Sequence, residues 1–290
     1  MKLYKTRKVN ILVHEDDYYV IDMDWNQLIN RDNLFKYLEG SLTDIVHIKA
    51  DDAVKIIQDE IVAPIGDQEV WAAGVTYLRS MEARMEESKA SGGADLYDKV
   101  YHADRPELFF KSLPHRVAGP NGVVNIRKDS KWDVPEPELT LFINSAGAIQ
   151  AYTAGNDMSS RSIEGENALY LPQAKIYERS AALGPCLHIL NGPISPETLI
   201  EMTIRRNSEK VYQDSVRFER MKRSPEELAG YLFRECHFEY GAFLMTGTCL
   251  VPPDTFTLAV GDEVDILVDG VGTLTNSIGY IDKDQILSAI

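Results

Sequence analysis

The sequence predicts an α+β fold that is rich in β-strand, with a small N-terminal α/β domain followed by a larger β-rich domain. Short apolar segments bounded by turn residues recur along the chain, which is typical of strands, whereas stretches of strong helix formers are few. Pro64 and Gly66 interrupt the chain where this pattern begins. We therefore expect a domain boundary here, with residues 1–63 on one side and 64–290 on the other.

The N-terminal domain is expected to alternate between strands and helices. Residues 10–14 and 18–23 are apolar and strand-like, and amphipathic helical segments follow at 26–38 and 51–57. This mixture predicts the α/β character of the domain.

The larger domain is expected to consist mainly of strands. Residues 139–143 and 149–154 are both apolar, and Ser-Ala-Gly at 145–147 between them is typical of a hairpin turn. Further strands are expected at 70–75, 108–111, 186–190, 201–206, 263–268 and 272–277. Helices are expected at 77–91, which is rich in helix formers, and from Ser224 to about residue 238. Ser224, Pro225 and Glu227 form an N-cap, a first-turn proline and a capping-box acid.

Composition argues against several classes of partner and site. The 290 residues carry 30 Lys and Arg against 45 Asp and Glu, a net charge of −15. Such a surface repels phosphate backbones and anionic lipids, so we expect neither nucleic-acid nor membrane binding. An anionic substrate is also repelled at long range, so its site needs a strong local positive centre. The three cysteines form no CxxC pair, and no stretch of eighteen apolar residues occurs, which favours a cytoplasmic protein.

The segment from Trp132 to Asp157 has the densest concentration of chemically useful side chains. Glu136 and Glu138 flank Pro137, and side chains two apart in extended backbone point to the same face. Two close carboxylates repel each other unless a cation lies between them. Asp157 follows one hairpin later, at an expected strand end, and can complete a site of three hard oxygen ligands suited to Mg²⁺ or Mn²⁺. From spacing alone, a solvated acidic edge explains the same residues equally well.

The chain also resembles the core of the fumarylacetoacetate hydrolase family. Members carry an E-x-E pair, an Asn-Asp-x-Ser-x-Arg stretch, a Lys ahead of a Gly-Pro, and a late Gly-Thr turn. This chain has PEPEL at 135–139, NDMSSR at 156–161, Lys175, Gly-Pro at 184–185 and TGT at 246–248. The likeness extends from about Val70 to the C-terminus. Within the family it is strongest for 2-keto-3-deoxy-D-arabinonate dehydratases, through LYDKVYHADRPELFFKSLPHRVAG, DSKWDVPEPEL and EGENALYLPQAKIY.

The resemblance implies a mixed β-sheet roll and a set of functional residues. Glu136, Glu138 and Asp157 would hold Mg²⁺, for which Mn²⁺ or Ca²⁺ could substitute. Lys175 matches the active-site lysine, Glu164 and Thr248 match positions that contact substrate, and Lys111 matches a pocket lysine. Each side chain also has a structural alternative: the lysines and Glu164 as surface residues, and Thr248 as a turn former. Arg161 could likewise pair with a core acid.

The region after residue 74 departs from the hydrolases of the family. Many of them carry G-x-N-Y-x-x-H-x-x-E, whose His and Glu activate water. Here Ser80 and Ala83 stand at those two positions, and neither side chain can act as a base with a pKa near 7. Hydrolysis is therefore disfavoured. Glu82 and Arg84 (or Arg79) in the same stretch could contact substrate, since a guanidinium suits a carboxylate, although most charges on a helix form its solvated face.

These features predict a lyase that dehydrates a 2-keto-3-deoxy sugar acid, such as an arabinonate or xylonate derivative, to 2-oxoglutarate semialdehyde. Neutral Lys175 would remove the C3 proton, with Glu107, Glu164 or Glu82 as the proton donor. The alternatives are a hydrolase or decarboxylase of a 2-keto acid or acylpyruvate, and a non-catalytic metal clip. The resemblance further implies a homodimer or homotetramer. The sequence does not reveal the stereochemistry of the acid or the role of residues 207–223.

Overall fold

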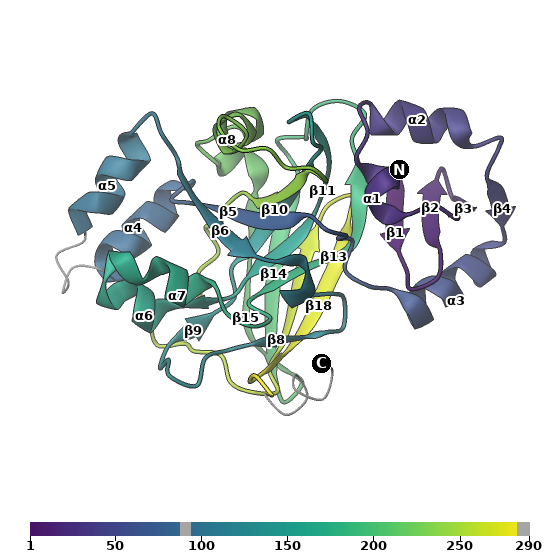
Figure 1. The fold of residues 1–290 in the computed structure, drawn as a ribbon. Helices are drawn as coiled ribbons and strands as arrows, with labels where there is room; N and C mark the ends of the chain where they lie inside the picture. Colours follow the sequence, from purple (N-terminus) through teal and green to yellow (C-terminus); the bar gives the residue numbers. More distant parts are fainter. Residues whose placement is uncertain (88–93, 283–290) are drawn as a thin grey trace.

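The computed structural model describes residues 1–87 and 94–282. Figure 1 shows a strand-rich body with the N-terminal elements at one end and a group of helices at the other. This architecture confirms the α+β, β-rich fold class. Within the described ranges, every helix is too short or too polar to traverse a bilayer.

A large mixed sheet of eleven strands runs through the molecule. In order, its strands are β4 (Val46–Ile48), β3 (Asp17–Ile21), β2 (Asn10–His14), β1 (Lys2–Lys5), β13 (Ala181–Ile189), β11 (Ile149–Asp157), β10 (Pro137–Ile143), β16 (Ala242–Met245), β5 (Glu69–Gly74) and β6 (Glu107–Ser112), with β7 (Val117–Ala118) beside β13. Strand β1 pairs antiparallel with β13, so the N-terminal strands continue the sheet of the larger part. The division at residue 64 stays a prediction.

A second sheet of five strands packs against this one. Its strands are β15 (Glu209–Arg217), β14 (Leu199–Arg206), β17 (Glu263–Val268), β18 (Gly272–Gly279) and β8 (Val123–Asn125). One apolar core contains Leu139 and Leu141 of β10 together with Ile204 of β14 and Ile266 of β17. A second core, which includes Phe142 and Phe243, joins the large sheet to the N-terminal helices. Strand β10 therefore buries both of its faces, which explains its nearly continuous apolar sequence.

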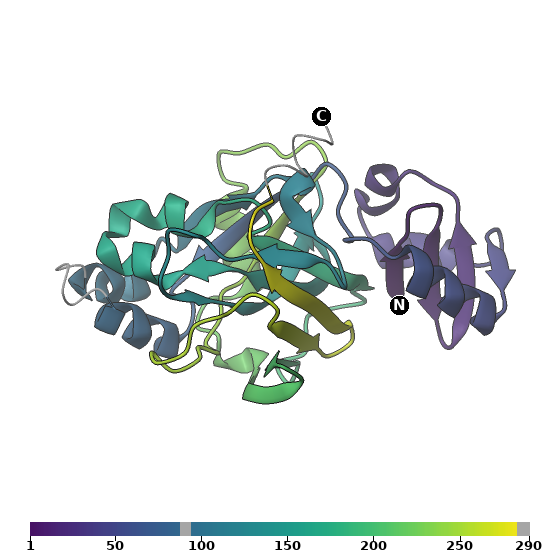
Figure 2. The ribbon, with the colours of Figure 1, turned by 90° about the horizontal axis from the view of Figure 1, so that it is seen from below.

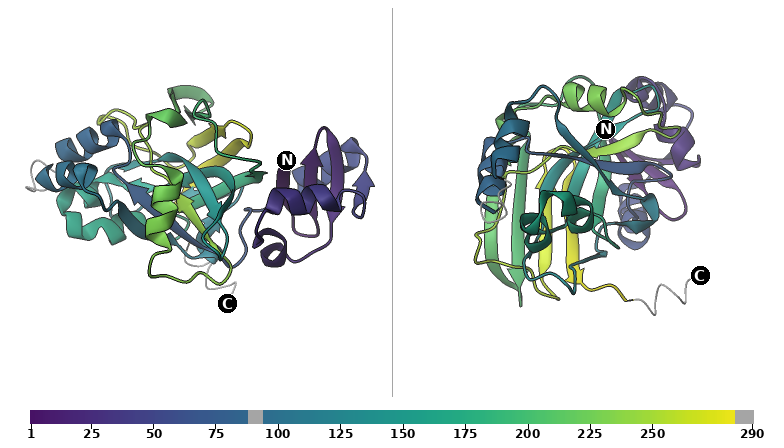
Figure 3. Two further views of the ribbon diagram at one scale, coloured as in Figure 1. Left: turned by 90° about the horizontal axis from the view of Figure 1, so that it is seen from above. Right: turned by 60° about the vertical axis from the view of Figure 1, so that its left-hand side comes forward.

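The helices lie at the two ends of the molecule and along its edge. Helices α1 (Trp25–Ile29), α2 (Leu34–Ser41) and α3 (Ala50–Glu60) belong to the N-terminal end, whereas α4 (Leu78–Glu87), α5 (Ala94–His102), α6 (Arg161–Glu166) and α7 (Leu171–Lys175) gather at the opposite end (Figures 2 and 3). Helix α8 (Pro225–Leu232) and the 3₁₀ turns 114–116, 168–170 and 218–220 complete the set. A two-stranded ladder of β9 (Asp133–Val134) and β12 (Ser159–Ser160) lies beside the carboxylate segment.

Two predicted helices differ from the structure. The segment expected as one helix at 26–38 forms α1 and α2, because Asn33 adopts a left-handed conformation with φ 51° between them. The helix that begins at Ser224 ends at Leu232, and Phe238 returns to stack on Trp71 and Phe233. The segment 207–223, whose role the sequence left open, contains the whole of the edge strand β15. Residues 88–91 of the predicted helix 77–91 lie outside the described residues.

Candidate active site

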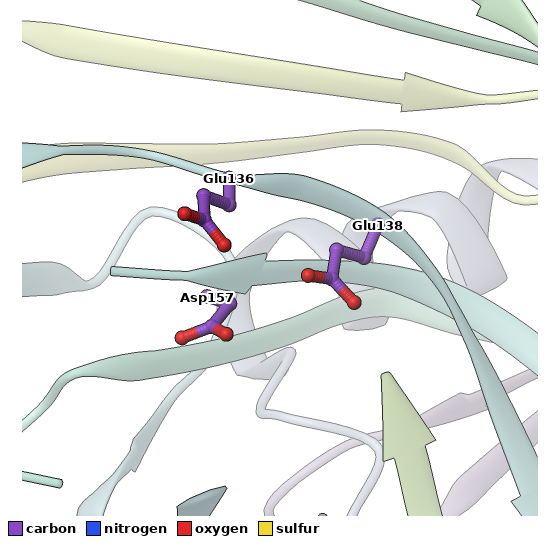
Figure 4. Close-up of side chains that lie close together, drawn as sticks. All are labelled: Glu136, Glu138 and Asp157. Carbon is purple, nitrogen blue, oxygen red and sulfur yellow. The ribbon is translucent and has the colours of Figure 1, made fainter. Parts of the chain in front are cut away.

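Three carboxylates from two adjacent strands meet in the interior (Figure 4). Glu138 lies in β10, Glu136 directly precedes that strand, and Asp157 is the last residue of β11. The antiparallel β10–β11 hairpin aligns Pro137 with Asn156, and the Asp157 amide donates a 2.9 Å hydrogen bond to the Glu136 carbonyl. One oxygen from each carboxylate lies within 4.8 Å of the others, and all three residues are buried. The expected grouping of these side chains is therefore present.

The cationic side chains around this group compensate its members unequally, and Glu138 is compensated least. Burial, and then the charges of Asp157 and Glu136, raise the pKa of Glu138 well above its ordinary value. Burial alone would also raise the pKa of Glu136, but the nearby charges of Lys175 and Arg161 outweigh it and hold that pKa below its usual range. Buried like charges at this separation are offset by a divalent cation, and oxygen-only ligands suit Mg²⁺. The donor set thus fits a hard divalent metal ion.

Lys175 closes one side of the carboxylate group. It is the last residue of α7, fully buried, and its Nζ donates to Glu136 Oε2 at 2.7 Å, to Asp157 Oδ2 at 3.2 Å and to Ser159 Oγ at 2.6 Å. Pro172 lies in the first turn of this short helix, where a proline is well tolerated. A primary amine in direct contact with two of the three carboxylates is well placed to exchange a proton with a bound substrate.

Further cations surround the carboxylates. Arg161 Nη2 lies 2.6 Å from Glu136 Oε1, and Lys111 Nζ lies 2.5 Å from Asp157 Oδ1. Arg84 of α4 forms an ion pair with Glu164 of α6, and both side chains are buried. Arg161 therefore pairs with a buried acid, Glu136, which is the structural role that the sequence left open for it.

The charges in this contact network cancel before any metal ion is counted. Its cations are Arg84, Lys111, Arg161 and Lys175, and its acids are Glu136, Glu138, Asp157 and Glu164. Four charges of each sign give 4 − 4 = 0 when all are ionised. A divalent cation makes the network positive, which provides the local positive centre that an anionic substrate needs on a chain of net charge −15.

A narrow pocket of about 10 Å³ lies over the carboxylates. Its lining comprises Ala73, Gly74, Val75, Ser80, Arg84, Phe109, Glu136, Glu138, Asp157, Arg161, Lys175, Gly247 and Thr248. Ser80 thus lines the pocket, and its Oγ donates to the Tyr77 carbonyl at 2.7 Å. The described lining contains no histidine. His102 in particular is exposed and lies 3.7 Å from Asp98, so it does not replace the missing hydrolase base.

The turn at Gly247 holds one carboxylate in place. The Gly247 amide donates to Glu138 Oε2 at 2.5 Å, and its φ of 96° favours glycine. A Cβ atom there would lie 2.0 Å from Thr76 Oγ1, so the close approach excludes a side chain. Val75 nearby has φ 55°, which is costly for a β-branched residue and is the kind of strain that clusters at functional sites.

Glu107 is enclosed next to the pocket. It begins β6, and its Oε2 is shut off from solvent without a hydrogen-bond partner among the described residues. A Cβ atom on Gly74, which lines the pocket, would lie 2.0 Å from that oxygen. Burial raises the pKa of Glu107 against the opposing charges of Arg84 and Lys175. A carboxyl group in such surroundings favours its protonated form, as a proton donor must.

The other candidates lie at different depths. Arg84 and Thr248 line the pocket, whereas Glu164 lies behind Arg84 as its ion-pair partner. Lys111 is absent from the lining and lies beneath Asp157, where its Nζ also donates to the backbone carbonyls of Met158 and Lys175. Glu82 is exposed and lines a separate pocket with Arg79 and Arg220. This geometry therefore does not favour Lys111 or Glu82 as residues that contact the substrate.

The candidates from the sequence did not include Phe109 or Val75, both of which line the pocket. The ring of Phe109 lies near Lys175, with Nζ 5.8 Å from the ring centre, and Val75 is a further apolar residue of the lining. The alternation of strand β6 puts Phe109 on the same face as Glu107. That alternation is the one sequence signal that could have indicated Phe109.

Comparisons with known proteins agree with this geometry. Residues 69–279 match the model of the fumarylacetoacetate (FAA) hydrolase C-terminal family. The chain is 46% identical to a probable 2-keto-3-deoxyxylonate dehydratase of Haloferax volcanii over 242 residues, 83% of this chain and 81% of that protein. It is 40% identical to the 2-dehydro-3-deoxy-D-arabinonate dehydratase of Saccharolobus solfataricus over 216 residues, 74% of this chain and 72% of that protein. A solved structure of a 2-keto-3-deoxy-D-arabinonate dehydratase with magnesium and 2,5-dioxopentanoate superposes with a TM-score of 0.82 at 30% identity, covering 97% of this chain and 99% of the other.

Proposed function

Since the chain belongs to the fumarylacetoacetate hydrolase family, we propose that it is a magnesium-dependent dehydratase of a 2-keto-3-deoxy pentonate. One observation carries the proposal. The Lys175 amine touches two members of a buried three-carboxylate group, in a pocket where Ser80 occupies the position of the hydrolase histidine.

The proposed metal ligands are Glu136, Glu138 and Asp157. Their juxtaposition within 4.8 Å, and the raised pKa of Glu138 among its neighbours, support this assignment. When bound there, Mg²⁺ supplies Lewis-acid polarisation of the substrate's keto group and offsets the charge of the three ligands.

Lys175 is proposed to take the C3 proton of the substrate in its neutral form. That proton is acidic because it lies next to the keto group, so an amine held near the carboxylates can remove it. Its short contacts to Glu136 and Ser159 fix the amine in position, which lowers the entropic cost of the transfer.

Glu107 is proposed to donate the proton with which the C4 hydroxyl leaves as water. Its carboxyl group is enclosed next to Gly74 in the pocket wall, and its environment favours the protonated form. Glu164 has Arg84 as its partner and Glu82 faces solvent, so both are weaker candidates for this step.

Arg84 and Thr248 are proposed to bind the substrate. Both line the pocket, and the planar guanidinium of Arg84 has the shape that suits a substrate carboxylate. The Thr248 hydroxyl lies one residue after the Gly247 turn that holds Glu138, which places it at the edge of the carboxylate group.

The overall reaction balances without a further reactant. One water leaves, C4 gains hydrogen, and C5 changes from an alcohol to an aldehyde. The product, 2-oxoglutarate semialdehyde, is the same compound as the 2,5-dioxopentanoate named with the related structure.

The names of the two relatives refer to different sugars, xylonate and arabinonate, but these names do not require two different substrates. Oxidation at C2 and loss of oxygen at C3 leave C4 as the single stereocentre of a 2-keto-3-deoxy pentonate. D-Arabinonate and D-xylonate have the same configuration at C4, so both give one and the same 2-keto-3-deoxy acid. We propose this D-pentonate as the substrate. The specificity that remains to be measured concerns the opposite C4 configuration and six-carbon analogues.

We further propose a homo-oligomer in the cytoplasm. The three described cysteines are free thiols, which supports a reducing compartment. The acidic charge balance supports the expectation that neither nucleic acid nor a membrane is a partner.

A substrate panel tests the proposal. The protein is incubated with Mg²⁺ and, in separate tubes, the 2-keto-3-deoxy-D-pentonate, its C4 epimer, an acylpyruvate and oxaloacetate, and each reaction is followed by NMR. We expect the aldehyde to form from the D-pentonate. Cleavage of the acylpyruvate or decarboxylation of oxaloacetate, with the pentonate unchanged, would overturn the dehydratase assignment.

A further inference from the structure

Helix α4, which lines the pocket, and its neighbour α5 have a small core of their own. Met81 of α4 and Tyr97 of α5 form a buried cluster with Val75, which precedes α4, and Met85, Val100 and Tyr101 are partly buried against it; this cluster is separate from the two main cores. Helix α4 carries two pocket residues, Ser80 and Arg84. Because so little apolar surface fixes this pair, its position over the carboxylates must depend on additional contacts.

Arg223 supplies a cluster of such contacts. Its side chain is buried, and the guanidinium donates to three backbone carbonyls at the C-terminal end of α5, those of Val100, Ala103 and Asp104. A cation is favourable there, because the last carbonyls of a helix carry partial negative charge. Glu227, in the first turn of α8, accepts a further 2.6 Å hydrogen bond from Arg223 and fixes the guanidinium from the other side.

Lys222 extends the attachment to the start of α4. Its amide donates to the Thr76 carbonyl at 2.9 Å, and its Nζ lies 4.1 Å from the Tyr101 ring centre. Thr76 in turn donates through Oγ1 to the Thr246 carbonyl at 2.7 Å, directly before the Gly247 turn that holds Glu138. The 222–223 segment is thus connected both to α5 and to the wall of the pocket.

The position of α5 affects the pocket through one aromatic ring, that of Tyr97. Tyr97 of α5 is buried, and the Arg84 guanidinium lies 5.8 Å from its ring centre while it pairs with Glu164. Tyr97 and the Arg223-bound Val100 are three residues apart and so lie on neighbouring turns of one short helix. A shift of α5 therefore moves one of the groups that orient Arg84.

We propose that Arg223 is a positioning residue that fixes α5 and thereby holds Arg84 over the carboxylate group. Residues 222 and 223, at the end of the segment 207–223 whose role the sequence left open, form the attachment site of α5. The consequence for turnover rests on the proposed function, whereas the attachment of α5 does not.

Amide hydrogen exchange and kinetics on the full-length protein test this together. Arg223→Gln is compared with Arg220→Gln, an exposed arginine in the same segment that forms no hydrogen bond or ion pair with the described residues. We expect exchange in α5 to rise at least about 10-fold in Arg223→Gln alone, with main-sheet exchange and magnesium affinity unchanged. KM for the keto acid should rise about 5- to 10-fold, with a smaller change in kcat.

Two further variants keep the test decisive if Arg223→Gln unfolds. Arg223→Lys retains a charge and three donors and should restore part of the α5 protection, and Glu227→Gln should loosen α5 slightly. Unchanged α5 exchange in all variants would overturn the attachment. Faster α5 exchange with an unchanged KM would overturn the positioning role. These outcomes can be distinguished from failure of the proposed function. In that case the wild-type protein would lack turnover, while the difference in α5 exchange between wild type and Arg223→Gln would persist.

Discussion

The Nζ atom of Lys175 lies 2.7 Å from Oε2 of Glu136, although 39 residues separate them in the chain. The contact joins the end of helix α7 to the start of strand β10, and it puts an amine and a carboxylate in one buried site. The same amine reaches Asp157, so a single side chain contacts two of the three proposed metal ligands. Catalysis by this protein is expected to depend on that arrangement.

Glu138→Gln is expected to abolish magnesium binding while leaving the fold intact. The amide can still accept from the Gly247 amide, and the buried repulsion with Asp157 and Glu136 disappears. We expect magnesium affinity to fall at least about 100-fold, as judged by calorimetry, without loss of thermal stability in the metal-free protein. Glu166→Gln, an exposed acid on α6, is the control. Wild-type magnesium affinity in Glu138→Gln would refute the ligand assignment.

Lys175→Met is expected to retain magnesium but lose turnover. The methionine fills a similar volume without a proton-transferring group, and the carboxylates of Glu136 and Asp157 remain available to the metal ion. The rate should fall by about 10²- to 10⁴-fold, which is the usual contribution of a general base. The measurement is steady-state turnover at saturating Mg²⁺. A variant with a near-normal rate would remove Lys175 from the mechanism.

Glu107→Gln is expected to lower kcat by about 10²-fold or more with little change in KM, because the amide cannot donate an acidic proton. The comparison is Glu82→Gln, which changes an exposed residue outside the carboxylate pocket and should leave kcat unchanged. Both variants are assayed with the same keto acid at saturating Mg²⁺. Loss of kcat in Glu82→Gln and not in Glu107→Gln would exchange the roles of these two acids.

Asp133 is expected to make stability depend on pH. Burial raises its pKa to about 6, so between about pH 4 and 6 the folded state keeps a proton that the unfolded state has lost. Stability therefore falls as pH rises through this window. Asp133→Asn removes the charge and should stabilise the protein at pH 7.5 by about 1–2 kcal/mol after solvent screening, and by less at pH 5.

Thermal denaturation of Asp133→Asn at the two pH values measures this effect. Asp129→Asn is the control, because Arg127 lowers the pKa of that exposed carboxyl group and its replacement gives no such gain. Equal stabilisation by Asp133→Asn at pH 5 and pH 7.5 would show that the charge of Asp133 is not the cause.

The sequence predicts strands well where one or both faces are buried. Strands β2 and β17 coincide with the predicted segments, since each has an apolar pattern bounded by turn residues. Strand β15 was not predicted, because none of its residues is buried and its mixed charges give no alternation. Strand β1 is only four residues long, and it is stabilised by pairing with β13, which lies far away in the sequence.

The carboxylate group could be anticipated because a local hairpin brings its members together. Glu136 and Glu138 are two apart, and Asp157 returns on the neighbouring strand. The pairing of Arg84 with Glu164 depends on how α4 packs near α6, and the enclosure of Glu107 depends on its closeness to Gly74. Such contacts between distant segments leave no periodic pattern in the sequence, so the structure was needed to distinguish Glu107 from Glu82.

The most direct test of the central proposal is magnesium-dependent formation of 2,5-dioxopentanoate. Protein treated with EDTA is incubated with the 2-keto-3-deoxy-D-pentonate, and the product is followed by NMR before and after Mg²⁺ is added to wild type and to Glu138→Gln. We predict no product before addition, rapid appearance of the aldehyde afterwards in wild type, and none in the variant. Product formation that EDTA does not stop, or equal restoration in Glu138→Gln, would contradict a dehydratase built on these three carboxylates.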